Sequence, residues 1–472
     1  MEQTQSIGIV ASGATRGAMT FYASKSIQTD YVCVQAENDT RIIFEVLREV
    51  VLNDRLTQAD NVRFIEPGDD YRRYNVYVSD TVPVACLDSK GQTYNNMYAI
   101  AAPGSRVRPA TEEELAQAYD VANESNRNCI GTLLNHNKVE VFIDLNHLLL
   151  RQTHLAIVGR TGSGKSWFVR HILDFLKMKY IVFSPTDEYD NLLSKHETWR
   201  KKDFILPINQ DTTKQFFNLN FSEQKLLRDF MKNGMENRPY EPEELSEAIV
   251  TYLRHSLLSQ KGNNHQLSLL NDEEEIIETS IPQYANTLCQ KIQDTGFRVQ
   301  KSETVLADSP LVSSVYNLQG CRRNEEERVI YSTLSPIFEK RKERFQIEQQ
   351  EIPLQDHLVI VLEEAQNYAP SNRTTFCKDL LVDIARTGRK YGIHILLLSQ
   401  RPRYIDQTIL SQCGGGIFFN LPNPEDVDYV MSSASLNRTT PFKNMIQNFD
   451  TGECILLRSE KKCQDLLCKI SF

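Results

Sequence analysis

The residues from Gly159 to Ser166, "GRTGSGKS", have the types and spacing needed to bind a chain of phosphate groups. They match the pattern G-x-x-x-x-G-K-[ST] in full, and the apolar run "HLAIV" before them and the helix-like "WFVRHILDFLK" after them supply the required strand–loop–helix context. Glycines let the backbone N–H groups converge on one phosphate, and a helix N-terminus adds positive potential. We therefore expect a nucleoside triphosphate site here, the alternative being a glycine-rich turn with an exposed lysine.

The roles within this loop follow from the side chains. The lysine should reach the β- and γ-phosphates, and the final hydroxyl should bind Mg²⁺. Lys165 is accordingly a catalytic candidate and Ser166 a metal ligand. The candidate nucleotide-binding residues of the loop are Gly159, Thr161, Gly162, Ser163, Gly164, Lys165, Ser166 and Trp167.

An acidic pair, Glu363-Glu364, follows the apolar run "LVIVL". A buried strand that ends in acids is the expected partner of a phosphate loop: the first acid holds the metal ion through water, and the second polarises the attacking water. We expect Glu363 to serve the metal and Glu364 to be the general base, although the two assignments stay open and an exposed acidic pair without a role is the alternative. Because the chain has no N-K-x-D run typical of GTPases, ATP is the expected substrate.

The stretch "RTGRKYGIHILLLSQRP" places a basic cluster before an apolar strand and Gln400 after it. Ligands of doubly wound sheets lie at the carboxyl ends of strands, so Gln400 is a candidate sensor of the γ-phosphate. Arg389 lies at the opposite end and should face away from its own nucleotide. In a ring it could neutralise transition-state charge at a neighbour's ATP, a role worth roughly 10³–10⁵ in rate. The alternative is a surface cluster that solvates a helix end.

Strands that alternate with helices must position these residues. From residue 129 to residue 472 the pattern predicts a parallel α/β sheet with covering helices, the core of a P-loop ATPase, with a mostly helical insertion at about 222–350. Residues 1–105 predict a small β-barrel of short strands, including "YNNMYAIAA", with one helix at 41–51 where apolar residues recur every three to four positions. A linker, 106–128, should contain a short helix.

Composition narrows the function classes. The 472 residues carry a net charge of -9, so a basic footprint over the whole chain is absent, although a few lysines and arginines lining a channel can still bind DNA. No apolar run approaches the ~20 residues of a membrane span. The N-terminus does not read as a signal peptide. Ten cysteines without a CxxC pair indicate reduced thiols. We expect a cytoplasmic protein without membrane contact.

With these motifs in view, the chain resembles the HerA family of hexameric ATPases, relatives of the FtsK DNA translocases. The resemblance rests on the segment from "CIGTLLNHNKVEVFIDL" into the phosphate loop, on "VFSPTDEY", and on "GRKYGIHILLLSQRP". It implies a RecA-like core, ATP and Mg²⁺ as cofactors, acidic roles for Glu363 and Glu364, a sensor role for Gln400 and a trans-acting Arg389. Arg151 is a second candidate for contact between subunits, and whether Arg386, Arg389 or Arg151 is the main trans arginine stays open. Glutamate replaces the family's usual aspartate at 363.

The resemblance further implies a homohexameric motor that moves double-stranded DNA through its pore. Partners would be a NurA-like nuclease or a defence effector (sirtuin-like or another nuclease) docked on the N-terminal barrel, in DNA repair or antiviral defence. The alternative is an ATP-gated ring scaffold that activates an effector without processive translocation. Candidate DNA contacts are Arg200, Lys201, Lys202, Arg322 and Arg323, with Lys340, Arg341, Lys342 and Arg344 as a further basic run that a solvated helix face would equally explain.

Overall fold

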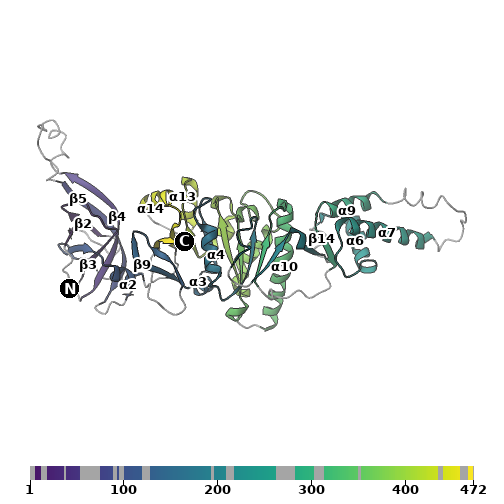
Figure 1. The fold of residues 1–472 in the computed structure, drawn as a ribbon, viewed down its shortest axis with the longest axis horizontal. Helices are drawn as coiled ribbons and strands as arrows, with labels where there is room; N and C mark the ends of the chain where they lie inside the picture. The colour runs from purple at the N-terminus through teal and green to yellow at the C-terminus, as the bar shows by residue number, and fades with distance from the viewer. Residues whose placement is uncertain are drawn as a thin grey trace, which may run out of the picture. The chain divides into compact units, whose positions relative to one another are not determined.

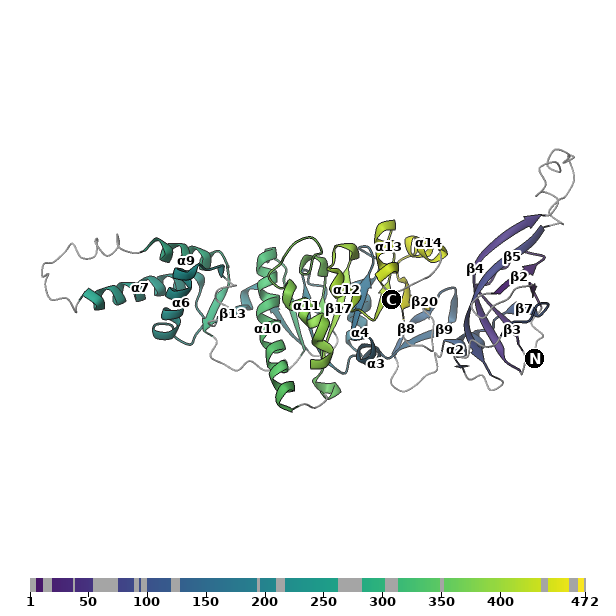
Figure 2. The same ribbon diagram turned by 180° about the vertical axis from the view of Figure 1, so that it is seen from behind.

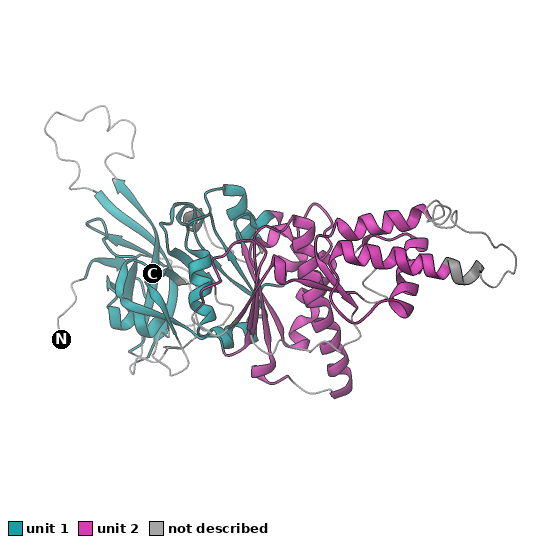
Figure 3. Ribbon diagram, turned by 45° about the vertical axis from the view of Figure 1, so that its right-hand side comes forward, with its two compact units in different colours: residues 1–176, 399–403, 413–472 teal, residues 177–398, 404–412 magenta. Residues whose placement is uncertain are grey.

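The structure, a computed structural model, describes residues 6–11, 19–36, 39–53, 75–88, 93–94, 100–119, 128–192, 196–208, 217–261, 282–301, 313–348, 352–433, 440–457 and 466–470. The chain divides into two compact units (Figure 3). Unit 1 contains residues 1–176, 399–403 and 413–472, and unit 2 contains residues 177–398 and 404–412.

A closed antiparallel β-barrel begins unit 1 (Figure 1, purple strands). Its strands are β1 (Gly8–Val10), β2 (Met19–Ala23), β3 (Tyr31–Gln35), β4 (Arg41–Asn53), β5 (Asn75–Leu87) and β7 (Arg106–Pro109). The short strand β6 (Thr93–Tyr94) pairs with the end of β5. The order β2-β1-β7-β3-β4-β5 closes because β5 also pairs with β2. Alternate side chains such as Phe21, Val32 and Val107 fill the interior, as expected for a small barrel.

Strand β4 shows that the helix predicted at 41–51 was wrong. The segment is a thirteen-residue strand paired with β5 along its length. Val46 pairs with Thr81 and Arg48 with the preceding Asp80, so Leu47 is an extra residue in the ladder. Such an irregularity breaks the inward–outward alternation and spaces apolar residues as a helix would.

The expected linker, 106–128, begins too early, because Arg106–Pro109 forms β7 inside the barrel, between β1 and β3. The two arginines of this strand, Arg106 and Arg108, made the segment look like a polar linker. The short helix is confirmed as α2 (Glu112–Ala118), and its N-cap Thr111 forms the predicted capping box with Glu114. Of the predicted strand "YNNMYAIAA", residues 95–99 lie outside the described residues.

The rest of unit 1 is a mixed sheet with flanking helices. Its strands run in the order β10 (His154–Val158), β18 (Gly415–Phe418), β19 (Glu453–Leu457), β20 (Leu466–Ile470), β8 (Asn128–Leu133) and β9 (His136–Ile143). Strand β10 pairs parallel with β18, and the pairs that follow are antiparallel. The helices are α3 (Leu145–Gln152), α4 (Lys165–Leu173), α13 (Pro424–Ser433) and α14 (Thr440–Asn448).

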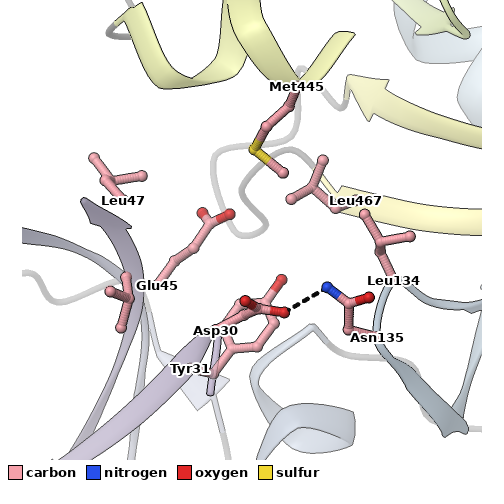
Figure 4. A pocket seen from close by; sticks show the side chains of 9 residues that line it. Asp30, Tyr31, Glu45, Leu47, Leu134, Asn135, Met445 and Leu467 are labelled. Atoms are coloured by element: carbon pink, nitrogen blue, oxygen red, sulfur yellow. Dashed lines mark hydrogen bonds between the residues drawn. The ribbon is translucent and has the colours of Figure 1, made fainter. Parts of the chain in front are cut away.

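Within unit 1 the barrel contacts this mixed sheet around a small cavity of about 50 Å³ (Figure 4). The Asn135 amide donates a 2.7 Å hydrogen bond to the Asp30 carboxylate. Leu47 of β4 packs against the apolar cluster that contains Leu467. The cavity has room for a water or two but not for a nucleotide or other organic ligand. It is therefore a point of attachment for the barrel rather than a binding site.

Unit 2 is built on a parallel sheet. Its strands run in the order β12 (His196–Arg200), β15 (Ser313–Asn317), β11 (Lys179–Ser184), β16 (Leu358–Leu362) and β17 (Ile393–Ser399, whose last residue belongs to unit 1). Strands β16 and β17 are buried at every position, as expected when helices cover both faces. Helices α10 (Arg323–Glu348), α11 (Lys378–Thr387) and α12 (Gln407–Ser411) belong to this unit, and α10 packs beside α11 (Figure 2).

The helical insertion lies between two short parallel strands, β13 (Ile205–Ile208) and β14 (Arg298–Lys301). Its helices are α6 (Phe221–Asn233), α7 (Pro242–Lys261) and α9 (Gln283–Gln293), which share one apolar core with Ile208 and Val299. The predicted end at about 350 was wrong, because β15 belongs to the main sheet and α10 follows it. The short, polar "SSVYN" of β15 gave little strand signal.

The architecture confirms the predicted α/β core of P-loop type, the N-terminal β-barrel and the helical insertion. The expectation that the sheet is parallel throughout was wrong, because the pairs from β18 to β9 are antiparallel. Among the described residues, no helix is both long enough and apolar enough to cross a membrane.

Candidate nucleotide site and arginine turn

The phosphate loop lies in unit 1 between β10 and α4. Gly162 and Gly164 have φ values of +74° and +106°, which side chains other than glycine rarely adopt. Gly164 is the N-cap of α4, so the helix starts at Lys165 and its first N–H groups face the loop. The strand, loop and helix predicted from the sequence are confirmed, and the backbone is preformed to receive an anion.

Hydrogen bonds hold the loop in this shape. The Lys165 ammonium donates to the Arg160 carbonyl at 2.9 Å, and the Ser163 hydroxyl donates to the same carbonyl at 2.8 Å. Lys165 is only 8% exposed. Its charge therefore lies over the loop, where a phosphate would give it a stronger partner than a carbonyl.

Gln400, the predicted sensor, lies beside the loop within unit 1. The Thr161 hydroxyl donates to the Gln400 side-chain oxygen at 2.6 Å, and the Gly159 N–H donates to the Ser399 carbonyl at 3.1 Å. The structure therefore brings two residues 239 positions apart into direct contact. The contact places the amide within reach of whatever the loop binds, and its sensor role stays a prediction.

Sequence reasoning missed two further segments that hold the loop, one at Thr451-Gly452 and one at Asn420. The Thr451 hydroxyl donates to the Gly162 carbonyl at 3.2 Å, and the Gly452 N–H donates to the Ser163 carbonyl at 3.0 Å. The Arg160 N–H donates to the Asn420 carbonyl at 2.7 Å. Two of these three contacts use only backbone atoms, so residue types could not have revealed them.

The remaining two candidates of unit 1 lie on helices. The Trp167 ring in α4 stacks on His171 one turn later, with centroids 5.2 Å apart. Arg151 is exposed in the last turn of α3. Their roles in binding nucleotide or a second subunit stay predictions.

The acidic pair lies in unit 2 directly after β16. Glu363 is 7% exposed, and its Oε2 accepts hydrogen bonds from the Ser184 hydroxyl and, at 3.4 Å, from the Thr186 hydroxyl. Glu364 has φ +54°, a left-handed conformation that costs a non-glycine residue about 1 kcal/mol. Such strain is found where a structure must aim a side chain. The two carboxylates thus have different environments, one buried on hydroxyls and one in a strained, half-buried turn.

The N-terminus of α10 lies against the residues that follow this pair. The Arg323 guanidinium donates to the Asn367 side-chain oxygen at 3.0 Å, and Arg373 donates to the Asn367 carbonyl at 2.8 Å. Burial raises the pKa of the Glu326 carboxyl to about 7, although the nearby Arg323 acts in the opposite direction. Arg323, predicted as a DNA contact, therefore also supports the loop after Glu364.

Arg389 lies in a 3-10 turn, Gly388–Tyr391, between α11 and β17. The side chains of Arg386 and Arg389 are exposed, and neither makes a hydrogen bond or ion pair among the described residues. Because β16 and β17 are parallel, this turn and the acidic pair lie at opposite edges of the sheet. The five residues of β16 separate these edges by about 16 Å at ~3.3 Å per residue.

Most candidate DNA contacts have partners within the chain. Arg200 pairs with Asp190 at 2.8 Å, Lys201 with Glu325 at 2.7 Å, Lys342 with Glu339 at 2.8 Å and Arg344 with Glu348 at 3.0 Å. Arg341 is only 4% exposed and donates hydrogen bonds to backbone carbonyls. Both predictions for this residue, a DNA contact or a solvated helix face, were therefore wrong. Helical charge patterns do not reveal which positions are buried.

Lys202 and Arg322 are exposed, and their side chains make no hydrogen bond or ion pair within the described part of unit 2. They lie on neighbouring turns, because Lys201 bonds both the Gly320 carbonyl and Glu325. Trp199 lies shortly before Lys202 in the chain, is 36% exposed and stacks on Tyr316. It also borders an apolar pocket of about 380 Å³. Sequence reasoning did not single out Trp199.

Comparison with known proteins decides the family. The family described as "Helicase HerA, central domain" matches residues 128–386, more than half of the chain. The chain belongs to the HerA family. It is 25% identical over 480 residues to the DNA double-strand break repair helicase HerA of Sulfurisphaera tokodaii, covering 96% of this chain and 90% of that protein.

Other HerA relatives give a similar picture. The DNA double-strand break repair helicase HerA of Sulfolobus acidocaldarius is 25% identical over 482 residues, covering 98% of this chain and 92% of that protein. Among solved structures, VirB4 of Thermoanaerobacter pseudethanolicus aligns with a TM-score of 0.46 and 15% identity, covering 74% of this chain and 98% of VirB4. The phosphate loop and the family together identify this HerA-family chain as an ATPase.

Proposed function

We propose that this chain is the motor subunit of a homohexameric ring that hydrolyses ATP to move double-stranded DNA. The observation that carries the proposal is the family match over residues 128–386, which spans the complete phosphate loop and the acidic pair. The relatives matched over nearly the whole chain are named DNA double-strand break repair helicases. The barrel, the loop and the arginine turn supply the parts that such a motor uses.

Within each subunit, the residues divide the work of hydrolysis. Lys165 would neutralise charge on the terminal phosphates, and Glu364 would accept a hydrogen bond from the attacking water and orient it. The Gln400 amide, already in contact with Thr161, would hydrogen-bond the γ-phosphate. Hydrolysis of this phosphate would then change the partner of Gln400, which directly follows β17.

The residues also fit Mg²⁺. The Ser166 hydroxyl and the Glu363 carboxylate are oxygen donors, which Mg²⁺ prefers. Among the described residues, no group of three or more His, Cys, Asp or Glu forms a site made of protein ligands alone. This donor set suits an ion that arrives with ATP and keeps water and phosphate ligands. When bound, the ion neutralises charge on the β- and γ-phosphates.

The arginine turn supports a ring. Arg389 is exposed, points to no partner in its own described chain, and lies about 16 Å from its own acidic pair, at the ~3.3 Å rise of each β-strand residue. A guanidinium so placed cannot reach a γ-phosphate held beside its own acidic pair. In a ring of like subunits it would reach the γ-phosphate of the neighbour, with Arg386 and Arg151 as further contacts between subunits.

DNA would be held by sequence-independent contacts to phosphates. Lys202 and Arg322 are the strongest candidates, because their side chains are exposed and have no competing partner within the described part of the chain. Such contacts weaken steeply with salt, since each neutralised phosphate releases counterions. The barrel, with its own closed core, would dock a NurA-like nuclease or another effector, including a defence effector.

Stimulation of ATP hydrolysis tests this proposal. We expect long duplex DNA to raise the ATPase rate at low salt and the effect to fade as salt increases. Exchange of both Lys202 and Arg322 for glutamine should remove the stimulation and spare the rate without DNA. Exposed Gln346→Ala in α10 is the control and should leave the stimulation intact. A rate indifferent to DNA would contradict the motor.

One observation favours the alternative, an ATP-gated scaffold. Arg200, Lys201, Lys342 and Arg344 are paired with carboxylates of their own chain, which leaves less charge for DNA. In that case ATP would hold the ring together and activate an effector on the barrel, and DNA would not move. ATP-dependent effector activity in the absence of DNA would support this second function.

A further inference from the structure

Arg341 is a buried cation in the middle of α10. Its Nη1 donates to the carbonyls of Tyr391 and Gly392 at 2.9 and 3.0 Å, and its Nη2 donates to the carbonyl of Asp356 at 2.6 Å. One side chain therefore ties α10 to the residues that enter β16 and β17. Burying a guanidinium in this way requires that its donors be satisfied.

The carbonyls that Arg341 holds belong to the end of the arginine turn. The Tyr391 ring packs edge-on against Phe338 and Phe345 of α10, with centroids 5.7 Å apart in both pairs. The Lys390 ammonium lies over the Phe345 ring at 4.6 Å. Within the turn, the Arg389 side chain is exposed and makes no hydrogen bond or ion pair with the described residues.

The chain after the turn is also fixed. Gly392 has φ +63°, and a Cβ there would come within 3.3 Å of the His357 ring. His357 is hydrogen-bonded to His394 at 2.8 Å and to the Ile352 carbonyl at 3.0 Å. The backbone of the turn is therefore held in place by α10 and by the residues that enter β16 and β17. These contacts fix the direction in which the exposed Arg389 side chain extends.

We propose that Arg341 is a positioning residue that fixes the turn from which Arg389 reaches the neighbouring subunit. The inference rests on the trans role proposed above for Arg389. Arg341 would touch neither nucleotide nor DNA, and it would act on the active site of the next subunit rather than its own. Preorganisation of this kind matters because a catalytic group displaced by about 1 Å can lose roughly 10²-fold in rate.

The geometry of the guanidinium makes the position specific for arginine. Two of its nitrogens reach three carbonyls on two separate segments. A lysine keeps the charge but offers a single nitrogen, so it cannot span the same acceptors. Arg341→Lys should therefore loosen the turn while keeping a cation in α10, which makes it the informative variant.

Mixed rings test the proposal. Lys165→Ala subunits keep an intact arginine turn but cannot hydrolyse ATP, whereas Arg389→Ala subunits keep an intact nucleotide site. Coexpressed and purified through two tags, these two variants should restore hydrolysis where they alternate. Arg341→Lys rings should lose about 10²-fold in kcat with KM for ATP within twofold. Their activity should recover when mixed with Lys165→Ala and should not recover when mixed with Arg389→Ala.

The mixtures separate the possible failures. If Arg341→Lys recovers with Arg389→Ala, or fails to recover with Lys165→Ala while the reference mixture does recover, its defect lies in its own site and the inference is overturned. If the reference mixture itself shows no recovery, the trans role of Arg389 is wrong and the inference falls with it. A purely structural defect would not produce this pattern of rescue.

Two further variants keep the test decisive. Exposed Gln346→Ala on the same helix is the matched control and should behave as wild type. If Arg341→Lys yields no rings, Phe345→Leu takes its place in the same mixtures, because it removes a ring that packs on Tyr391 without disturbing a buried charge. It should show the same recovery pattern with a smaller loss of rate.

Discussion

At the scale of single residues, the two carboxylates after β16 have distinct surroundings that suggest distinct roles. Glu363 is buried on the Ser184 and Thr186 hydroxyls, whereas Glu364 occupies a strained left-handed turn. A base must approach the water that it orients, and a metal-side acid need only hold a fixed place. On these surroundings, Glu364 stays the predicted base and Glu363 the predicted metal-side acid.

Glutamine substitutions distinguish the two acids. Glu364→Gln should lower kcat by about 10³-fold with ATP affinity nearly unchanged, because general-base catalysis contributes roughly 10²–10⁴. Glu363→Gln should instead raise the Mg²⁺ concentration needed for half-maximal rate. Steady-state kinetics with Mg²⁺ titrations checks both. The assignment is reversed if the Mg²⁺ requirement moves in the Glu364 variant.

The buried carboxyl of Glu326 should make the folded protein less stable as pH rises. Its pKa is raised from 4.5 to about 7 by burial, so the folded state binds the proton more tightly than the unfolded state. The stability that the proton confers is complete below about pH 4.5 and is lost as pH rises to about 7. Glu326→Gln should therefore gain about 1 kcal/mol over wild type at pH 8, after discounting for partial solvent exposure, and less at pH 5.

Thermal unfolding at the two pH values measures this gain. Exposed Glu343→Gln on the same helix should change the melting temperature equally at both. A Glu326 variant whose melting temperature differs from wild type by the same amount at pH 5 and pH 8 would disprove the raised pKa.

At the scale of elements, the sequence predicted what repeating patterns specify. The phosphate loop, β16 and β17 followed such patterns in their glycine spacing and apolar runs. Strand β4 did not, because its extra Leu47 disrupts the alternation. Arg341 did not, because its buried state depends on the Tyr391 and Gly392 carbonyls, which are some fifty residues away. Every residue has a backbone carbonyl, so contacts to these atoms cannot be predicted from the residue types.

Helix α2 shows one residue doing two structural tasks. Glu114 completes the capping box and also pairs with Arg41 of β4 at 2.9 Å and Arg108 of β7 at 2.6 Å. Burial alone would raise its pKa, but the hydrogen bonds from Arg108 and the Thr111 backbone outweigh burial and lower the pKa to about 2. The carboxylate therefore ties the helix to the barrel.

Glu114→Gln should destabilise the protein by about 2 kcal/mol at pH 7, the usual worth of hydrogen bonds to a charged group. Because the folded pKa is lowered, this stability is present above about pH 4.5 and is lost as pH falls toward 2. Thermal melts at pH 7 and pH 4 should show the variant's deficit shrinking in acid. Exposed Glu113→Gln in the same helix is the control. An equal loss of stability in this control would contradict a special role of Glu114 in holding α2 to the barrel.

At the scale of the whole molecule, the role proposed for Arg389 requires a ring. Arg389 lies at the sheet edge opposite its own acidic pair, so the catalytic role proposed for it needs a nucleotide that another subunit brings. We expect particles of six subunits by native mass spectrometry with ATP and Mg²⁺. A stable monomer that hydrolyses ATP at full rate would remove the reason for assigning Arg389 a role in trans.

A translocating motor uses ATP hydrolysis to move along duplex DNA, and displacement of a roadblock protein measures this movement. A tightly bound protein is placed on long duplex DNA, and its release is followed with ATP. We expect release that requires ATP, slows with roadblock distance from the loading end, and is absent for Glu364→Gln rings that still bind DNA. A ring that hydrolyses ATP on this DNA yet leaves the roadblock in place would contradict translocation and favour the scaffold.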